Sequence, residues 1–132
     1  EIPDYALVGD RELLLKPMVM NNLYTSVLSF LRIDTGLETR QYGFRDACSR
    51  LVELDETIAL PRGYRLAGEP RSEQKAAPAA DFEGSLQQVG NKLVLKQKLA
   101  LKKRIYRAAD WEGFRAAVNA YKSFADYLIV KL

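Results

Sequence analysis

The sequence contains no histidine and a single cysteine, Cys48, among its 132 residues. An internal disulfide and any multi-cysteine metal site are therefore excluded. The absence of histidine also excludes catalysis by a Cys-His pair or a Ser-His-Asp triad, because both need an imidazole as general base. A lone cysteine without such a base is typical of a small buried hydrophobic residue, and this is what we predict for Cys48.

Other common sites are missing as well. The eight glycines are dispersed and form neither GxGxxG nor GxxxxGK, so the usual phosphate-binding loops are absent. Acidic residues are crowded between positions 46 and 56 but lack the D-x-D-x-D-G spacing of a calcium loop. We expect them to form a solvated cluster: Asp46, Glu53, Asp55 and Glu56. We predict no catalytic residue, no metal and no cofactor in this chain.

No stretch approaches the roughly 20 apolar residues that cross a bilayer, and the first 30 residues lack the pattern of a signal peptide. We therefore predict no direct insertion into a membrane. Hydrophobic residues make up 48% and charged residues 28%, which is ordinary for a soluble globular domain. The sequence begins with Glu1 and not with Met, so we interpret residues 1–132 as a single domain that is a fragment of a longer protein.

The most conspicuous feature is a basic run, residues 91–107, which reads NKLVLKQKLALKKRIYR and has seven Lys or Arg residues and no acid. The whole chain has a net charge of +3, so the run's +7 leaves −4 for the remaining residues. Such a local strip of cations is what a protein that binds nucleic acid or another anion would present.

The spacing in the basic run favours a structural explanation. Apolar residues fall mainly on odd positions and cations mainly on even ones, which is the period of a strand with one face on a core and the other in water. Gln97 and Lys103 interrupt the odd positions, and Val94 and Ala100 fall on even ones. The odd set is Leu93, Leu95, Leu99, Leu101 and Ile105, and the even set is Lys92, Lys96, Lys98, Lys102 and Arg104.

An alternative hypothesis remains for the same surface, namely a binding site for an acidic peptide or glycan made of Lys96, Lys98, Lys102 and Arg104. We predict no nucleic-acid binding, because the run has no aromatic residue before Tyr106 on which bases could stack. A third hypothesis is catalysis by carboxylates alone, such as Glu53 and Asp55.

Residues 81–89 precede the basic run and lead into Gly90-Asn91, a pair suited to a two-residue hairpin turn. With Val89 opposite Lys92, the register places Phe82 opposite Leu99, Leu86 opposite Leu95, Gln88 opposite Leu93 and Glu83 opposite Lys98. Shifting one strand by a single residue would oppose apolar side chains to lysines, so the pattern defines its own pairing.

Other strands are predicted from shorter patterns. Residues 51–60 alternate and end at Pro61, and residues 37–44 are expected to form a strand after a turn at 34–36. The segment 67–80 is poor in large apolar residues, so we expect a loop or ragged edge. Near the N-terminus we predict a hairpin around Asn21-Asn22 that pairs Met20 with Leu23, although Leu23, Val27, Leu28 and Leu31 also suit one face of a helix.

The last 25 residues change period. Apolar residues recur at helical spacing after Asp110, a residue that can cap a helix, and the chain then ends in the β-rich segment DYLIVKL. The helix-face residues are Trp111, Phe114, Val118 and Tyr121. Trp111, Tyr106 and Phe114 could instead form an aromatic platform for a ligand, but the spacing favours a core. We predict an α+β, mainly β fold: an antiparallel β-sandwich or curled sheet with one C-terminal helix.

Three segments in order, LPRGYRL, VGNKLVLKQKLALKKRIY and DWEGFRAAVNAYKSFADYLIV, resemble an uncharacterised C-terminal domain that follows a transglutaminase-like domain in bacterial cell-envelope proteins. The resemblance covers roughly residues 51–132. It departs from the family at Trp111, where Tyr is expected, and in the Ala-rich segment 67–80, where the family often has a further strand.

The resemblance implies a periplasmic or cell-envelope location and an accessory role beside a Cys-His-Asp amidase or peptidase-like domain. The implied partner is this neighbouring domain of the same parent chain, and the catalytic residues would belong to that domain. Our leading hypothesis is therefore a non-catalytic domain that supports its neighbour or presents its substrate.

Overall fold

The computed structural model describes residues 5–18, 33–124 and 126–132. The predicted hairpin around Asn21-Asn22 lies outside these residues. The described elements, in chain order, are β1 (Ala6–Val8), β2 (Glu12–Leu15), β3 (Phe44–Arg45), β4 (Arg50–Ala59), β5 (Arg65–Leu66), β6 (Arg71–Ala76), β7 (Ala80–Val89), β8 (Lys92–Leu101), β9 (Ile105–Tyr106), a 3-10 turn (Ala108–Asp110), α2 (Trp111–Phe124) and β10 (Leu128–Lys131).

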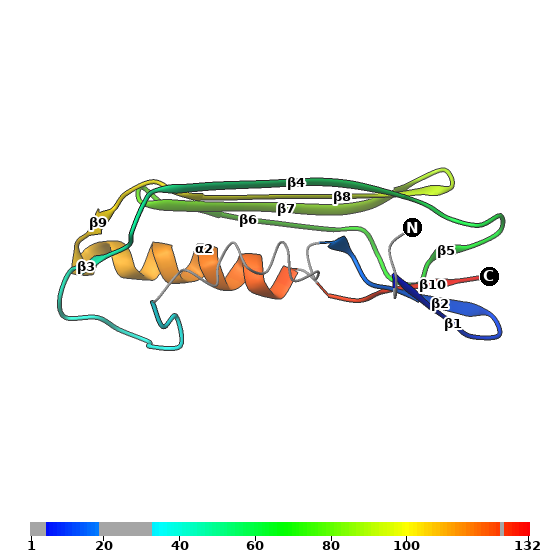
Figure 1. Ribbon diagram of the computed structural model, residues 1–132, viewed down its shortest axis with the longest axis horizontal. Helices are drawn as coiled ribbons and strands as arrows, with labels where there is room; N and C mark the ends of the chain where they lie inside the picture. Colours follow the sequence, from blue (N-terminus) through cyan, green and yellow to red (C-terminus); the bar gives the residue numbers. More distant parts are fainter. Residues whose placement is uncertain (1–4, 19–32, 125) are drawn as a thin grey trace.

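The described strands form three antiparallel groups. The main sheet has the order β4-β8-β7-β6, the small sheet has the order β1-β2-β10-β5, and β3 pairs with β9. Figure 1 shows the main sheet as one layer, with α2 beneath one half of it and the small sheet towards the other end. The predicted α+β class, mainly β with one C-terminal helix, is confirmed.

The predicted hairpin of β7 and β8 is confirmed to the residue. Phe82 lies opposite Leu99, Leu86 opposite Leu95, and Val89 opposite Lys92. Gly90 in the turn has a φ of 62°, a conformation that costs glycine little because it has no Cβ. The predicted strand within residues 51–60 is confirmed as β4, which pairs with β8 along its whole length.

The predicted alternation holds within β8. Its odd-numbered leucines are buried and Lys92, Lys96 and Lys98 are exposed, so the inner face of the main sheet supplies much of the core. The alternation fails beyond Leu101, because the chain leaves the main sheet there. Ile105 belongs to the short strand β9 and is 74% exposed, whereas Tyr106 is buried.

Two predictions of local structure are corrected by the structure. The segment 67–80, predicted as a loop or ragged edge, contains β6 at residues 71–76, a strand at the edge of the main sheet paired with β7, so the loop alternative was wrong. The segment has almost no apolar pattern because it is exposed and hydrogen-bonds along only one side. The strand expected over residues 37–44 is reduced to Phe44 and Arg45, since residues 37–43 run as an irregular segment along α2.

The C-terminal helix and final strand are confirmed. Trp111, Phe114, Val118 and Tyr121 are buried against the main sheet. The polar side of α2 also makes contacts: Arg115 and Asn119 donate to the backbone oxygen of Thr35, at 3.1 and 3.4 Å. Lys122 donates to the Thr35 hydroxyl at 3.1 Å. These bonds fasten the turn at Thr35 to the helix.

Candidate functional site

The cations on the main sheet are paired with acids of the neighbouring strand. Lys96 Nζ lies 3.2 Å from Asp55 Oδ2, and Lys98 Nζ lies 3.1 Å from Glu53 Oε1. Each pair sits at directly opposed positions of β8 and β4, and all four side chains are about half exposed or more. Their pairing follows from the register, which puts the acids of one strand beside the lysines of the next.

A shallow hollow of about 400 Å³ lies on this surface. Its walls are two cross-strand rows of side chains, Glu53-Lys98-Glu83 and Asp55-Lys96-Ser85, and its floor is the backbone of the row between them. The named side chains carry two positive and three negative charges. The hollow is therefore not a basic pocket, and its charge does not favour an acidic ligand.

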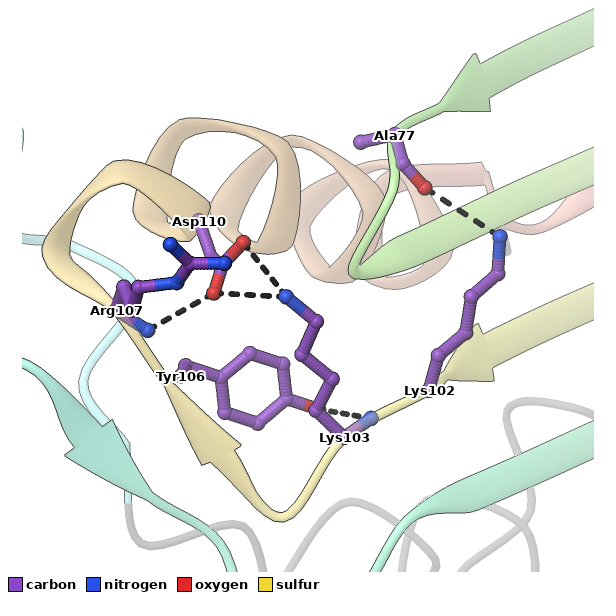
Figure 2. A network of polar contacts seen from close by, with 6 residues as sticks. All are labelled: Ala77, Lys102, Lys103, Tyr106, Arg107 and Asp110. Carbon is purple, nitrogen blue, oxygen red and sulfur yellow. Dashed lines mark hydrogen bonds and ion pairs between the residues drawn. The ribbon is translucent and has the colours of Figure 1, made fainter.

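The next predicted site residue, Lys102, lies at the end of the main sheet. Its ammonium pairs with Asp81 and donates to the backbone oxygen of Ala77 at 3.4 Å. The hydrogen bond from Lys102 lowers the pKa of the Asp81 carboxyl. Figure 2 shows Lys102 directed at the loop that joins β6 to β7. This cation therefore holds a loop of its own sheet.

Lys103 and Asp110 form a second polar contact, between the connection after β8 and the 3-10 turn (Figure 2). Lys103 Nζ lies 3.0 Å from Asp110 Oδ1, and the backbone N–H of Arg107 donates to Asp110 Oδ2 at 2.8 Å. These two donors, the Arg107 N–H first, lower the pKa of Asp110. The expectation that Asp110 caps α2 was wrong, because Asp110 closes the 3-10 turn that precedes the helix.

Arg104, the fourth residue of the predicted binding surface, lies in the connection between β8 and β9. Its backbone oxygen accepts from the N–H of Asp46 at 2.9 Å, and its side chain is exposed. The structure thus brings Lys96 and Lys98 together on the sheet face. It places Lys102 at the β6-β7 loop and Arg104 beyond the end of the strand.

The acidic residues between 46 and 56 do not form one solvated cluster. Glu53 and Asp55 are exposed as predicted, but Asp46 and Glu56 are buried. Asp46 accepts two hydrogen bonds from Arg50, at 2.8 and 3.0 Å, and this interaction lowers the pKa of the Asp46 carboxyl.

Glu56 joins the N-terminal segment to the main sheet. It accepts from the Tyr5 hydroxyl at 2.6 Å and from the backbone N–H of Met18 at 2.9 Å. Burial, followed by the hydrogen bond to Glu56, raises the pKa of the Tyr5 phenol far above its ordinary value. The inward position of Glu56 could have been found from the sequence, because it shares the parity of Leu54 and Ile58 on β4.

The aromatic residues form part of the core and not an exposed platform. Phe44 stacks on Tyr106 with ring centroids 4.7 Å apart and meets Trp111 and Phe114 edge-on at 5.3 and 5.0 Å. The guanidinium of Arg40 lies over the Trp111 ring, 4.4 Å from its centroid. The predicted core role of these aromatic residues is confirmed.

Cys48 is exposed, so the prediction of a buried cysteine was wrong. It lies in the irregular connection between β3 and β4, where the inward and outward alternation of a strand does not apply. No group of three or more Cys, Asp or Glu side chains in the described part of the chain is arranged to hold a metal ion.

In the described part of the chain, the acids and tyrosines whose pKa values are shifted have them shifted away from neutral pH. The carboxyl pKa values of Asp46, Asp81 and Asp110 are lowered, and burial raises those of the Tyr106 and Tyr121 phenols. A general acid or base works best with a pKa near the operating pH. These groups are therefore suited to fixed charges and hydrogen bonds.

Comparison with known families gives a match to the model of DUF3858, a domain of unknown function with a solved structure, over residues 11–130. The chain belongs to this family. No curated protein matches the sequence. The matched range includes the strands β2 to β9, α2 and all of β10 except Lys131, so DUF3858 describes nearly the whole fold.

Among solved structures, the chain is similar to a crystal structure at 2.00 Å resolution of a protein from Parabacteroides distasonis ATCC 8503, described as "a putative protease". The TM-score is 0.70 at 14% sequence identity, and the similarity covers 95% of this chain. At this identity the similarity establishes a common fold. The chain spans about a quarter, 24%, of the length of the Parabacteroides protein.

No helix in the described part of this DUF3858 chain is long and apolar enough to cross a membrane.

Proposed function

We propose that this DUF3858 chain is a non-catalytic accessory domain of a longer bacterial envelope protein, where it supports a transglutaminase-like amidase or peptidase domain or presents substrate to it. The observation that carries the proposal is the similarity to the Parabacteroides protein. Nearly all of this chain corresponds to only 24% of a protein described as "a putative protease". The three segments that resemble the domain after a transglutaminase-like domain support the same arrangement, and with it a periplasmic or cell-envelope location.

The chemistry of the described residues supports a non-catalytic role. Lys96, Lys98 and Lys102 are paired with acids of their own sheet. Asp46 is held by Arg50, and the exposed thiol of Cys48 has no histidine anywhere in the sequence to serve as its base.

The hypothesis of an acidic peptide or glycan ligand receives less support. An anion that binds Lys96 and Lys98 would have to displace Asp55 and Glu53 from contacts of 3.2 and 3.1 Å, and Glu83 would remain in the same cross-strand row. Exchanging one carboxylate for another gives little net affinity, because both partners are solvated when apart.

The test is an amide-hydrolysis assay on the intact parent protein. We expect Cys48→Ser, and separately Glu53→Gln with Asp55→Asn, to leave kcat and KM within about twofold of the parent values, because these residues touch no reacting atom. Replacing the cysteine of the transglutaminase-like domain is expected to abolish activity. A fall in kcat of about tenfold or more for Cys48→Ser, with unfolding unchanged, would contradict the proposal because such a loss indicates a nucleophile or proton-transfer role.

A further inference from the structure

The two faces of the small sheet differ in what covers them. One face carries Leu13, Leu15, Leu128 and Val130, which are buried in the core. The opposite face carries a cross-strand row of aliphatic residues, Leu7-Leu14-Ile129, set by the pairing of β2 with β1 and β10. Leu7 is 63% exposed and Ile129 is 45% exposed, and Tyr127, two residues before Ile129, is 46% exposed. We refer to Leu7, Leu14, Tyr127 and Ile129 as the apolar outer face.

This face contrasts with the exposed face of the main sheet, where ion pairs such as Lys98-Glu53 occupy neighbouring strands. The charged residues of the small sheet lie at one end of it, where Lys131 Nζ is 3.7 Å from Glu12 Oε2. An apolar centre with a charged rim is the usual composition of a protein interface. A solvated antiparallel sheet face normally carries polar residues instead.

The surface beside the apolar outer face is also concave. A hollow of about 320 Å³ lies where the small sheet meets β6, and its lining combines Tyr127, Ile129 and Leu86 with the cation Arg71 and the acids Glu69 and Asp126. The guanidinium carbon of Arg71 lies 5.2 Å from the centroid of the Phe124 ring. The hollow therefore joins apolar side chains to charges of both signs, a composition that suits the border of a protein interface.

The position of this face indicates what covers it. The first and last strands described, β1 and β10, both belong to the small sheet, and Figure 1 shows β1 and the C-terminal end of the chain at this end of the molecule. About three quarters of the Parabacteroides protein lies outside the part that matches this chain. A domain joined to either end would be held close to the apolar outer face at high effective concentration.

We infer that the apolar outer face is the docking surface for the neighbouring domain of the same polypeptide. This inference rests on the part of the proposed function that makes the chain one domain of a longer protein. Docking in this position would fix the orientation of the neighbouring domain. The exposed face of the main sheet would remain in solvent.

The test is hydroxyl-radical footprinting of the intact parent protein, with Leu51 as internal control. Leu51 lies on the exposed face of the main sheet in β4 and is 62% exposed, so it matches Leu7 in residue type, strand environment and exposure. If the neighbouring domain covers Leu7, its oxidation should be slower than that of Leu51 by about threefold or more, because interface centres exclude water. Equal rates at Leu7 and Leu51 would overturn the inference.

A pair of variants gives an independent readout. In the intact protein we expect Leu7→Asp to speed protease cleavage between the two domains, and Leu51→Asp to leave the cleavage rate unchanged. Equal effects of the two variants would count against docking. Protection of Leu7 that is lost when a dimer dissociates on dilution would also overturn the inference, because a second copy would then be the occupant.

These results are separable from a failure of the proposed function. A parent protein without a Cys-His-Asp domain, but with Leu7 protected in the monomer, would refute the proposed function and retain the docking surface. A parent protein with that domain, but with Leu7 and Leu51 oxidised equally, would refute the docking surface alone.

Discussion

Gln97 offers the sharpest test of how the main sheet is packed. It is 3% exposed, and neither its side-chain oxygen nor its side-chain nitrogen has a hydrogen-bond partner. On the inner face of the sheet it lies between Leu54 and Gly84, in a row where the absent side chain of Gly84 leaves room for the ring of Phe124. Leaving a buried polar group unpaired costs about 1–3 kcal/mol.

Replacing Gln97 by Met keeps the side-chain length and removes the unpaired amide, so we expect the free energy of unfolding to rise by about 2 kcal/mol. An entropy of unfolding of about 2.1 cal/mol/K per residue converts this gain into a melting temperature about 7 °C higher for a chain of this size. Urea denaturation followed by the fluorescence of the buried Trp111 measures the change.

Gln74→Met is the matched control, because Gln74 is exposed on the edge strand β6. Its effect should stay within about 0.5 kcal/mol, as for ordinary surface positions. A Gln97→Met variant that is less stable than the parent chain, with Gln74→Met neutral, would refute the reasoning. It would mean that the amide of Gln97 is stabilising where it lies.

Two further predictions concern a buried ion pair and a tight contact. Asp46→Asn should lower the free energy of unfolding by about 2 kcal/mol at neutral pH, since hydrogen bonds to charged groups contribute about 1.5–3 kcal/mol. Folding lowers the pKa of Asp46, so the Asp46 carboxylate stabilises the fold at any pH above the unfolded pKa of about 3.9. This stabilisation is lost as the pH falls through the pKa of the folded state. The difference in free energy of unfolding between the parent chain and Asp46→Asn should therefore vanish in acid. Urea titrations from pH 7 to pH 2 measure this, and a difference that is constant with pH would contradict it. Gly113→Ala should destabilise the chain by about 1–3 kcal/mol, although alanine normally favours a helix, because a methyl group there would overlap the Cβ of Ala77. A melting temperature higher than that of the parent chain would show instead that the loop between β6 and β7 moves to make room.

The sequence predicted the elements whose side chains alternate over many residues. The β7-β8 hairpin was predicted with its register, because Phe82, Leu86 and Leu95 can be buried together in one pairing only. The helix at Trp111–Phe124 was predicted because its apolar residues recur at a spacing that places them on one face. In both cases burial of one face determines the structure.

The parts that the sequence did not predict depend on contacts between distant segments. β6 has no alternating pattern because β7 supplies its hydrogen bonds and most of its side chains remain in solvent. Thr35 and Leu37 are held by polar groups of α2, which carry no periodic signal. For the candidate site, the sequence predicted that Lys96 and Lys98 face solvent. Their pairing with Asp55 and Glu53 required the β4-β8 register.

Within the basic run, residues Lys92–Leu101 form a strand whose leucines are buried and whose lysines are exposed to solvent. The most direct test is to compare urea unfolding of two variants at adjacent residues, Leu95→Asp and Lys96→Gln. We expect Leu95→Asp to lose more than about 3 kcal/mol of stability or to fail to fold, because the carboxylate would be buried without a partner, whereas Lys96→Gln should change stability by less than about 0.5 kcal/mol. A stable Leu95→Asp protein, or a Lys96→Gln protein that unfolds, would show that this strand does not have the orientation described.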